Sequence, residues 1–271
     1  MRKHQFKILL SVICAASCLL LTSCGFQTDD TSMTKMQKLR IGSDIYPPFV
    51  FLDSNGKASG IDVDIAKTAF AGLGYEAEFE IIDWEEKKTL VENGDIDCIW
   101  GCFSMSGRES DYNWAGPYMV SRQMVAVNQS SDIYTFDDLK DKTVMVQTTS
   151  KPEEILLSGM DKRIPHIEEL ISTEDRAVQY AALGCGYVDA IAAHETAILK
   201  YMSDYNADFR FIEEPLLVTG IGVAFSKEDE RGLSEALNEE LKIMREDGSM
   251  AEIIGRYLND PDKYLEVGSL E

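Results

Sequence analysis

The order of strand-like and helix-like patterns along the chain predicts an α/β protein built as two lobes. After residue 38, short apolar or alternating segments typical of strands take turns with segments of helical spacing. The alternation begins again after residue 140, so two such units follow one another. Strands that alternate with helices are typical of a largely parallel sheet. About 230 residues of folded chain are enough for one large domain or two small lobes.

The first unit opens with the short strand pattern Leu39-Arg40-Ile41-Gly42. Residues 61–73 carry apolar side chains at helical spacing, and Gly72 and Gly74 mark the end of that helix. Alternation from residue 77 indicates a strand, and the next helix is expected to stop at Gly94. The strands of this unit are expected at 39–42, 77–82, 97–103 and 119–127, and the helices at 61–73 and 85–93.

The second unit repeats this order and is followed by a helical C-terminal segment. Its strands are expected at 143–147, 167–170 and 189–193, and its helices at 153–158 and 173–183. Two further helices are expected at 233–244 and 250–258, separated by Glu246-Asp247-Gly248.

The N-terminus predicts export and a lipid anchor. Arg2, Lys3 and Lys7 precede an apolar run over residues 8–21, which is typical of a secretory signal and short for a membrane-spanning helix. The run ends in Leu21-Thr22-Ser23-Cys24, which resembles the bacterial lipobox; the alternatives are an ordinary signal peptide or a chance cysteine. We expect a signal peptide over 1–23, lipid on Cys24, a flexible polar stalk over 24–37, and a place on the extracytoplasmic face of the cell membrane.

Composition excludes several classes of function. The formal charge is −21, and it becomes −24 without residues 1–23, which hold three basic residues and no acidic ones. Such a chain repels phosphate backbones, so no nucleic-acid partner is expected. Three cysteines follow Cys24, namely Cys98, Cys102 and Cys185, and the whole chain has three histidines. So few potential ligands, scattered along the sequence, argue against a metal site. No second apolar run is long enough to span a bilayer, which argues against a channel or permease.

Several strings together resemble the bacterial extracellular solute-binding proteins of family 3, the receptors of ATP-driven importers for polar amino acids. The resemblance runs from about Leu39 to Leu258. The strings are Ile41-Gly42-Ser43-Asp44, Tyr46-Pro47-Pro48-Phe49, Gly60-Ile61-Asp62-Val63-Asp64-Ile65-Ala66, Asp83-Trp84, Asn93-Gly94-Asp95-Ile96-Asp97, Ser104-Met105-Ser106-Gly107-Arg108, Trp114-Ala115-Gly116-Pro117-Tyr118, Val144-Met145-Val146-Gln147, Tyr187-Val188-Asp189-Ala190-Ile191 and Met244-Arg245-Glu246-Asp247-Gly248-Ser249.

The resemblance implies a two-lobe periplasmic-binding-protein-like clamp of type II, in which each lobe is a β-sheet flanked by helices and the chain crosses the hinge twice. On that template, lobe 1 comprises 38–119 and 220–271, and lobe 2 comprises 120–219. The implied function is capture of a small polar ligand, expected to be an amino acid, and its delivery to an ABC import permease. A monomer without a cofactor and without catalysis is expected.

The resemblance also assigns a carboxylate-binding cradle. Arg108 matches the family's arginine that grips a ligand carboxylate, and a guanidinium presents a planar fork suited to two oxygens. Ser104 and Ser106 match positions that complete the cradle, and Ser150 lies at a helix start expected to close over the carboxylate. The residues alone leave simpler roles open: a solvated arginine, turn-forming serines and an ordinary helix cap.

Two aromatic residues and an aspartate are expected around the ligand side chain. Tyr46 and Trp84 match positions that sandwich it, and Asp44 could face a cationic group there. Plain packing is the alternative for an aromatic residue beside Pro47-Pro48. Lys87 and the lysine that follows it are expected to be solvated, although one could reach an acidic group.

His194 is the main departure from the family pattern. It stands where many members have an aspartate that pairs with the ligand ammonium, and a neutral imidazole supplies no negative charge. Glu195 could reach the ammonium instead, or the ligand could lack one. The same pair keeps open an enzyme on this fold, similar to periplasmic dehydratases, with His194 and Glu195 as acid and base. Adjacent strand residues point to opposite faces, which argues against that alternative.

Overall fold

Strands and helices alternate along residues 36–270, the part of the chain that the computed structural model describes. The strands are β1 Gln37–Ser43, β2 Phe51–Leu52, β3 Ala58–Ser59, β4 Tyr75–Ile81, β5 Cys98–Ser104, β6 Asn113–Asn128, β7 Thr143–Gln147, β8 Glu169–Thr173, β9 Ala190–His194, β10 Phe209–Phe211 and β11 Leu217–Phe225. The helices are α2 Ile61–Gly72, α3 Lys87–Asn93, α4 Lys151–Ser158, α5 Arg176–Gly184, α6 Glu195–Tyr205, α7 Leu233–Glu246 and α8 Ser249–Gly255. The expected signal peptide and Cys24 lie outside the described residues.

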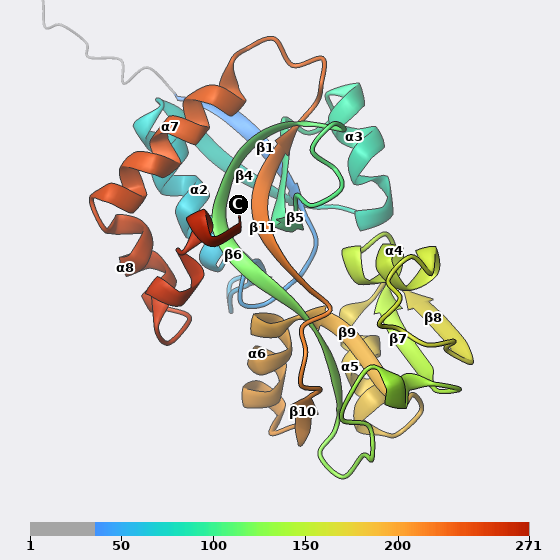
Figure 1. The fold of residues 1–271 in the computed structure, drawn as a ribbon. Helices are drawn as coiled ribbons and strands as arrows, with labels where there is room; N and C mark the ends of the chain where they lie inside the picture. Colours follow the sequence, from blue (N-terminus) through green and yellow to red (C-terminus); the bar gives the residue numbers. More distant parts are fainter. Residues whose placement is uncertain (1–35, 271) are drawn as a thin grey trace, which may run out of the picture. The chain divides into compact units, whose positions relative to one another are not determined.

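Nine of these strands join in one mixed sheet of order β4-β1-β5-β11-β6-β9-β7-β8, in which β10 pairs with β6 (Figure 1). The pairs of β1 with β4 and β5, and of β7 with β8 and β9, are parallel. The pairs that involve β6 and β11 are antiparallel. The fold is therefore α/β as predicted, but its sheet is less parallel than the alternation indicated.

The first lobe is built on β1, β4 and β5. In α2, the apolar positions Ile61, Ile65 and Phe70 are fully buried against this sheet and against α7 and α8. Gly60 precedes α2 with φ 130°, a conformation that only glycine adopts readily, and an added Cβ there would collide with the carbonyl of Phe49. Burial of this apolar face supplies most of the helix stability.

The second lobe is built on β7, β8 and β9. Its core is apolar on both faces of β7 and β9: Val144 and Val146 face one cluster, and Met145 and Ile191 face the other. Such continuous burial is typical of parallel strands covered by helices on both sides. Helices α4, α5 and α6 belong to this lobe (Figure 1).

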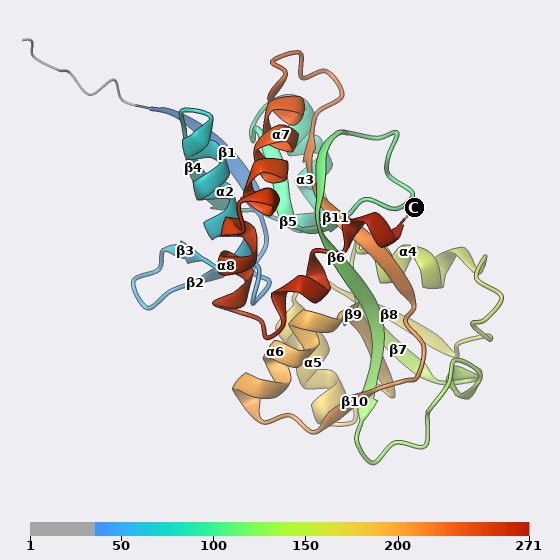
Figure 2. The same ribbon diagram turned by 60° about the vertical axis from the view of Figure 1, so that its left-hand side comes forward.

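Two long antiparallel strands run through both lobes. β6 pairs with β11 along Asn113–Gln123 and then with β9 over Gln123–Val127. Val120 lies opposite Gly220 in the β6–β11 ladder, so the predicted lobe boundaries, 119/120 and 219/220, fall at one level of this ladder. Figure 2 shows β6 and β11 side by side between the two groups of helices.

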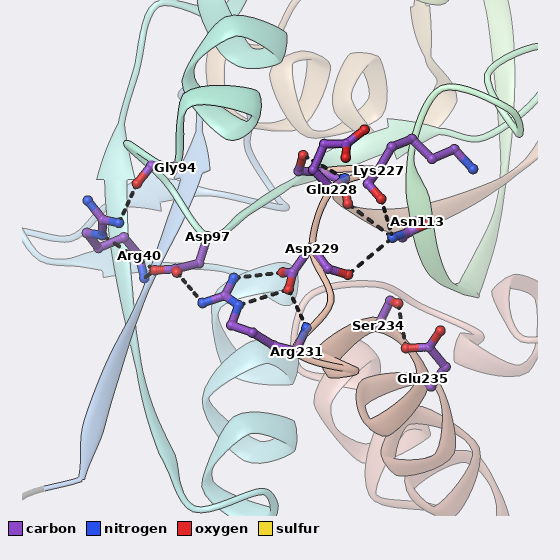
Figure 3. Close-up of polar contacts among 11 residues, drawn as sticks. Arg40, Gly94, Asp97, Asn113, Lys227, Glu228, Asp229, Arg231, Ser234 and Glu235 are labelled. Atoms are coloured by element: carbon purple, nitrogen blue, oxygen red, sulfur yellow. Dashed lines mark hydrogen bonds and ion pairs between the residues drawn. The ribbon is translucent and has the colours of Figure 1, made fainter.

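Some residues of the strings that resemble family 3 stabilise the fold. Asp97 accepts a hydrogen bond from the backbone N–H of Arg40 at 2.8 Å and pairs with Arg231 at 2.7 Å, which fastens the loop after β11 to β1 and β5 (Figure 3). The buried Asp62 accepts hydrogen bonds from the Tyr118 hydroxyl and the Cys102 N–H, both at 2.8 Å. Burial raises the pKa of Asp62 to about 7.

The sequence patterns did not indicate α6, β10 or β11. β11 is buried continuously over Thr219–Phe225 because it has neighbouring strands on both sides. Its sequence therefore lacks the alternation of polar and apolar residues by which a strand is recognised. The expected helix over 85–93 begins with a short 3-10 turn, Trp84–Glu86, before α3. Among residues 36–270, no helix is long and apolar enough to cross a bilayer.

Candidate ligand-binding site

A cavity lies where the carboxyl ends of β5, β7 and β9 meet the start of α4. Its free volume for a water-sized molecule is about 20 Å³ in this arrangement of the chain, and we call it the central cavity. Its lining residues are Trp84, Cys102, Phe103, Ser104, Arg108, Gln123, Gln147, Thr149, Ser150, Lys151, Pro152, Arg176, Ala192, Ala193 and His194. The first lobe supplies the residues from 84 to 108, and the second supplies those from 123 to 194. The carboxyl ends of strands in α/β sheets are the usual place for ligands.

Arg108 is held in the lining by neighbours on both lobes. Its Nη1 donates to the carbonyl of Ser104 at 3.3 Å, and its Nη2 pairs with Glu154 of α4 at 3.2 Å. The guanidinium carbon lies 5.0 Å from the centre of the Phe103 ring. The side chain is 13% exposed, so the solvated surface position does not apply. Burial lowers its pKa, but a guanidinium stays charged at neutral pH.

The two predicted serines of this segment lie differently. Ser104 ends β5, is buried in the lining, and its Oγ accepts a hydrogen bond from Gln123 at 3.3 Å. Ser106 does not line the cavity, and its Oγ lies 2.9 Å from the hydroxyl of Thr219 in β11. The turn that follows Ser106 passes through Gly107 at φ 74°, which brings Arg108 back toward Ser104.

Ser150 caps α4, as the simpler alternative has it, and it also lines the cavity, while its contact with a carboxylate stays a prediction. Its Oγ accepts a hydrogen bond from the N–H of Glu153 at 3.3 Å, in the geometry of an N-cap. Thr149, Lys151 and Pro152 line the cavity with it, so the amino end of α4 faces the space. Lys151 pairs with Glu154 at 2.5 Å.

Asp44 and Tyr46 are close to the cavity but already have a partner from the second lobe. Asp44 accepts hydrogen bonds from Gln147 at 2.7 Å and from Nε of Arg176 at 3.1 Å. The guanidinium carbon of Arg176 lies 3.3 Å from the centre of the Tyr46 ring. The chain's own arginine thus occupies the carboxylate and the aromatic face that were expected to receive a ligand side chain. Neither Asp44 nor Tyr46 lines the central cavity.

Trp84 lines the cavity as expected, and it covers a lysine. Nζ of Lys87 lies 4.8 Å from the centre of the indole and donates to the Thr149 hydroxyl at 2.8 Å and to the Trp84 carbonyl at 2.9 Å. Lys87 is 6% exposed, so the expectation that it is solvated was wrong. Burial, and then the charge of Arg108, lowers its pKa to about 8. Lys88 is exposed and pairs with Glu92 at 3.8 Å.

His194 ends β9 and uses both ring nitrogens on protein groups. Nδ1 lies 2.6 Å from the Ser121 hydroxyl, and Nε2 lies 2.7 Å from the side-chain amide of Gln123. Burial, together with the charges of Arg176 and Arg108, lowers the pKa of His194 to about 3, so the imidazole is neutral. Glu195 turns away at the start of α6 and pairs with Arg122 at 3.2 Å and Lys263 at 3.6 Å.

Gln123, Gln147 and Arg176 were not identified from the sequence. Gln123 follows Ser121 and Arg122 in the middle of β6, and Gln147 ends β7, so a polar side chain within or at the end of a buried strand was the available signal. Trp100 is fully buried against Phe70 and Tyr118 and takes no part in the lining. No group of three His, Cys, Asp or Glu residues that could hold a metal occurs within 36–270.

The model of the bacterial extracellular solute-binding proteins, family 3, matches residues 39–260 of the chain. The chain belongs to this family. A family member from Corynebacterium glutamicum, the glutamate-binding protein GluB, is 27% identical over 226 residues, which cover 78% of this chain and 75% of that protein. The L-cystine-binding protein TcyJ of Escherichia coli K12 is 29% identical over 211 residues, 76% of each chain.

Solved structures agree with this membership. An ancestral arginine-binding protein bound to arginine is similar with a TM-score of 0.74 and 27% identity, over 82% of this chain and 98% of that one. The family 3 chain therefore has the type II clamp fold predicted from the strings, and it is a solute-binding protein of the kind that serves ABC transporters. An ancestral amino acid-binding precursor of cyclohexadienyl dehydratase, 24% identical with a TM-score of 0.71, shares the fold.

Proposed function

We propose that this family 3 protein captures an amino acid in the central cavity and delivers it to an ABC import permease. The observation that carries the proposal is the buried Arg108, which lines a cavity formed by both lobes. A guanidinium in such a place can bind a carboxylate in a bidentate manner. The amino end of α4 faces Arg108 from the other lobe. Two relatives, the glutamate-binding protein GluB and the L-cystine-binding protein TcyJ, are each named for binding an amino acid, which supports the proposal.

The ligand ammonium is then bound by amide oxygens in place of a carboxylate. Gln123 and Gln147 line the cavity, and Oε1 of each is buried without a hydrogen-bond partner among the described residues. A buried acceptor without a partner costs free energy, about 1–3 kcal/mol, which a donor on the ligand would recover. The two amide oxygens thus supply acceptors for the ligand ammonium. His194 cannot do so because both of its nitrogens are used, and Glu195 cannot because it faces away from the cavity.

We further propose the domain arrangement 38–119 with 220–271 as lobe 1 and 120–219 as lobe 2, with the hinge at Val120 and Gly220. Ligand bound between the lobes favours their closed arrangement, which the permease recognises, and differential affinity for the two arrangements is the whole mechanism. A monomer held at the extracytoplasmic face by lipid on Cys24, after removal of residues 1–23, fits this role.

Binding without chemical conversion is part of the proposal. Acid–base catalysis by His194 and Glu195 would require both groups to face one ligand. Glu195 is instead engaged by Arg122 and Lys263, and the buried imidazole of His194 is neutral with both nitrogens occupied. The dehydratase-like alternative therefore has no acid–base pair among these residues.

Thermal unfolding of the purified protein against the twenty amino acids tests the proposal. A ligand at about a thousand times its dissociation constant adds roughly 4 kcal/mol to the stability of the folded state. We expect at least one amino acid to raise the melting temperature in a saturable way. If none does, and the protein is folded, the amino-acid proposal is wrong.

A further inference from the structure

The central cavity is basic although the protein as a whole is strongly acidic. Its lining contains Arg108, Lys151 and Arg176 and includes no aspartate or glutamate, whereas the whole chain carries a formal charge of −21. Cations gathered in a buried space repel one another, and their burial costs free energy unless anions lie close to them. The nearby anions therefore decide how much charge remains for a ligand.

Two carboxylates of the protein reach these cations from outside the lining. Asp44 pairs with Arg176 at 3.1 Å, which balances that arginine. Glu154 is shared, since it pairs with Arg108 at 3.2 Å and with Lys151 at 2.5 Å, and its side chain is 48% exposed. One carboxylate against two cations leaves one positive charge on this side of the cavity.

Lys87 adds a second positive charge. Its four contacts are with uncharged groups: the Thr149 hydroxyl, the Trp84 carbonyl and the faces of the Trp84 and Phe103 rings. It forms no ion pair within 4.0 Å among the residues described. Thr149, Trp84 and Phe103 all line the cavity, so the ammonium of Lys87 lies directly behind the lining, and it contacts the same Phe103 ring as Arg108.

We infer that the ligand is a small dicarboxylate, with one carboxylate on Arg108 and Ser104 and the second at Lys87 and Thr149. This inference rests on the proposed function and narrows it to acidic amino acids and their close analogues. Two carboxylates would pair with Lys87, which has no ion pair among the described residues, and with Arg108, which shares Glu154 with Lys151. A cationic side chain would find Oδ2 of Asp44 and the Tyr46 ring already engaged by Arg176, with only the buried Oδ1 of Asp44 left, so arginine and lysine are expected to bind less tightly.

Matched ligands test the inference on the unaltered protein by isothermal titration calorimetry. Glutamate and aspartate are compared with glutamine and asparagine, which differ only in the charge of the side chain, and with arginine and lysine. Glutarate and succinate form a separate arm, because they keep both carboxylates and lack the amino group. We expect a dicarboxylate to bind at least about tenfold more tightly than its amide or any cationic amino acid. Tighter binding of glutamine, arginine or lysine would overturn the inference.

Lys87→Met locates the second carboxylate, and Lys88→Met is its matched control on the same helix. Loss of the buried cation should weaken the dicarboxylate about tenfold or more and leave the monocarboxylate amide within about threefold. The control should change neither, because Lys88 is exposed and pairs with Glu92. Equal loss for both ligands in Lys87→Met would contradict the assignment of this subsite.

The failure of this inference differs from the failure of the proposed function. Binding of neutral amino acids with no preference for a dicarboxylate leaves the receptor function standing and rejects the dicarboxylate. Binding of glutarate or succinate but of no amino acid supports the dicarboxylate and rejects the amino-acid function. If a folded protein binds nothing in any arm, both are wrong.

Discussion

At the scale of single residues, the site depends on which polar groups are left free by the protein. Arg108 shares Glu154 with Lys151, and the amide oxygens of Gln123 and Gln147 have no partner among the described residues. His194 has the opposite character, since Ser121 and Gln123 occupy both of its nitrogens. The free groups are therefore a cation for a carboxylate and acceptors for an ammonium.

Replacement of Arg108 by alanine should abolish tight binding without unfolding the protein. The carboxylate would lose its charged partner in a buried space, which costs about 2–5 kcal/mol and weakens binding at least about thirtyfold. Calorimetric titration measures this loss, and the melting temperature of the ligand-free variant checks the fold. Arg256→Ala is the control, because Arg256 is an exposed arginine of the α8 C-cap. Unchanged affinity in Arg108→Ala would contradict the carboxylate assignment.

The neutral state of His194 makes a prediction about acid stability. Its pKa is lowered to about 3 in the folded chain, so the unfolded chain, with an ordinary pKa near 6.5, binds the proton more tightly. The stability contributed by this group is complete above about pH 6.5 and is lost as the pH falls toward 3. Asp62, whose pKa is raised to about 7, acts in the opposite direction over part of this range.

A comparison of the protein with His194→Gln separates the two effects, because Asp62 is present in both. Between pH 7.5 and pH 5.5, the original protein should lose about 1.4 kcal/mol more of its unfolding free energy than the variant. Urea denaturation at the two pH values measures the difference. Equal losses would show that His194 is not buried in the neutral form.

At the scale of elements, α4 links the cavity to the second lobe. Its cap residue Ser150 and its first residues line the space, and Glu154 on the next turn reaches across to Arg108. At this helix end Pro152 has no N–H, and the N–H groups of Glu153 and Glu154 bind the hydroxyl and the carbonyl of Ser150, so the end favours an anion through the Ser150 hydroxyl and the helix dipole. Helix α4 is therefore expected to contribute both to the stability of the fold and to the affinity for the ligand.

Ser150→Ala should reduce both the stability of the folded protein and its affinity for the ligand. Loss of an N-cap costs about 1 kcal/mol, or roughly 2–4 °C in melting temperature for a chain of this size, and the ligand loses a hydroxyl at the same position. Ser158→Ala at the other end of α4 is the matched control, since Ser158 is exposed and bonds only within its own turn and the next residues. A variant with lower stability but unchanged affinity would limit Ser150 to its capping role.

The elements near the site were largely predictable, whereas the partners of their side chains were not. Trp84, Ser104, Arg108, Ser150 and His194 lie at ends of predicted strands and helices, and the structure brings them to one cavity. Asp44 and Tyr46 were expected there too, but Arg176, 132 residues from Asp44, covers them. Periodicity reports which face of an element is buried, and it carries no information on which distant side chain reaches that face.

At the scale of the whole described chain, the lobes are held together by polar contacts around the cavity. Arg176 and Gln147 of the second lobe bind Asp44 of the first, and Lys87 of the first lobe donates to Thr149 of the second. The pair of Asp44 with Arg176 is buried, with side chains 12% and 10% exposed. Removal of one partner of such a pair leaves the other charge uncompensated.

Asp44→Ala should therefore favour separation of the lobes. Solvation of Arg176 in an opened arrangement would relieve its buried charge, and the radius of gyration of the ligand-free variant should exceed that of the original protein. Small-angle X-ray scattering measures the change. Asp204→Ala is the control, because Asp204 pairs with Lys200 on the exposed face of α6. Identical radii in all three proteins would contradict a role for Asp44 in holding the lobes together.

Native mass spectrometry of the purified protein, mixed with glutamate and its amide and kept for several hours, tests the central claim most directly. It reports the number of bound ligands, their mass and any conversion in one measurement. We predict one bound glutamate per chain, preferred over glutamine, unchanged in mass and absent from Arg108→Ala. A complex that forms equally with Arg108→Ala, or a bound molecule whose mass has changed, would contradict the account of a carboxylate-gripping receptor without chemistry.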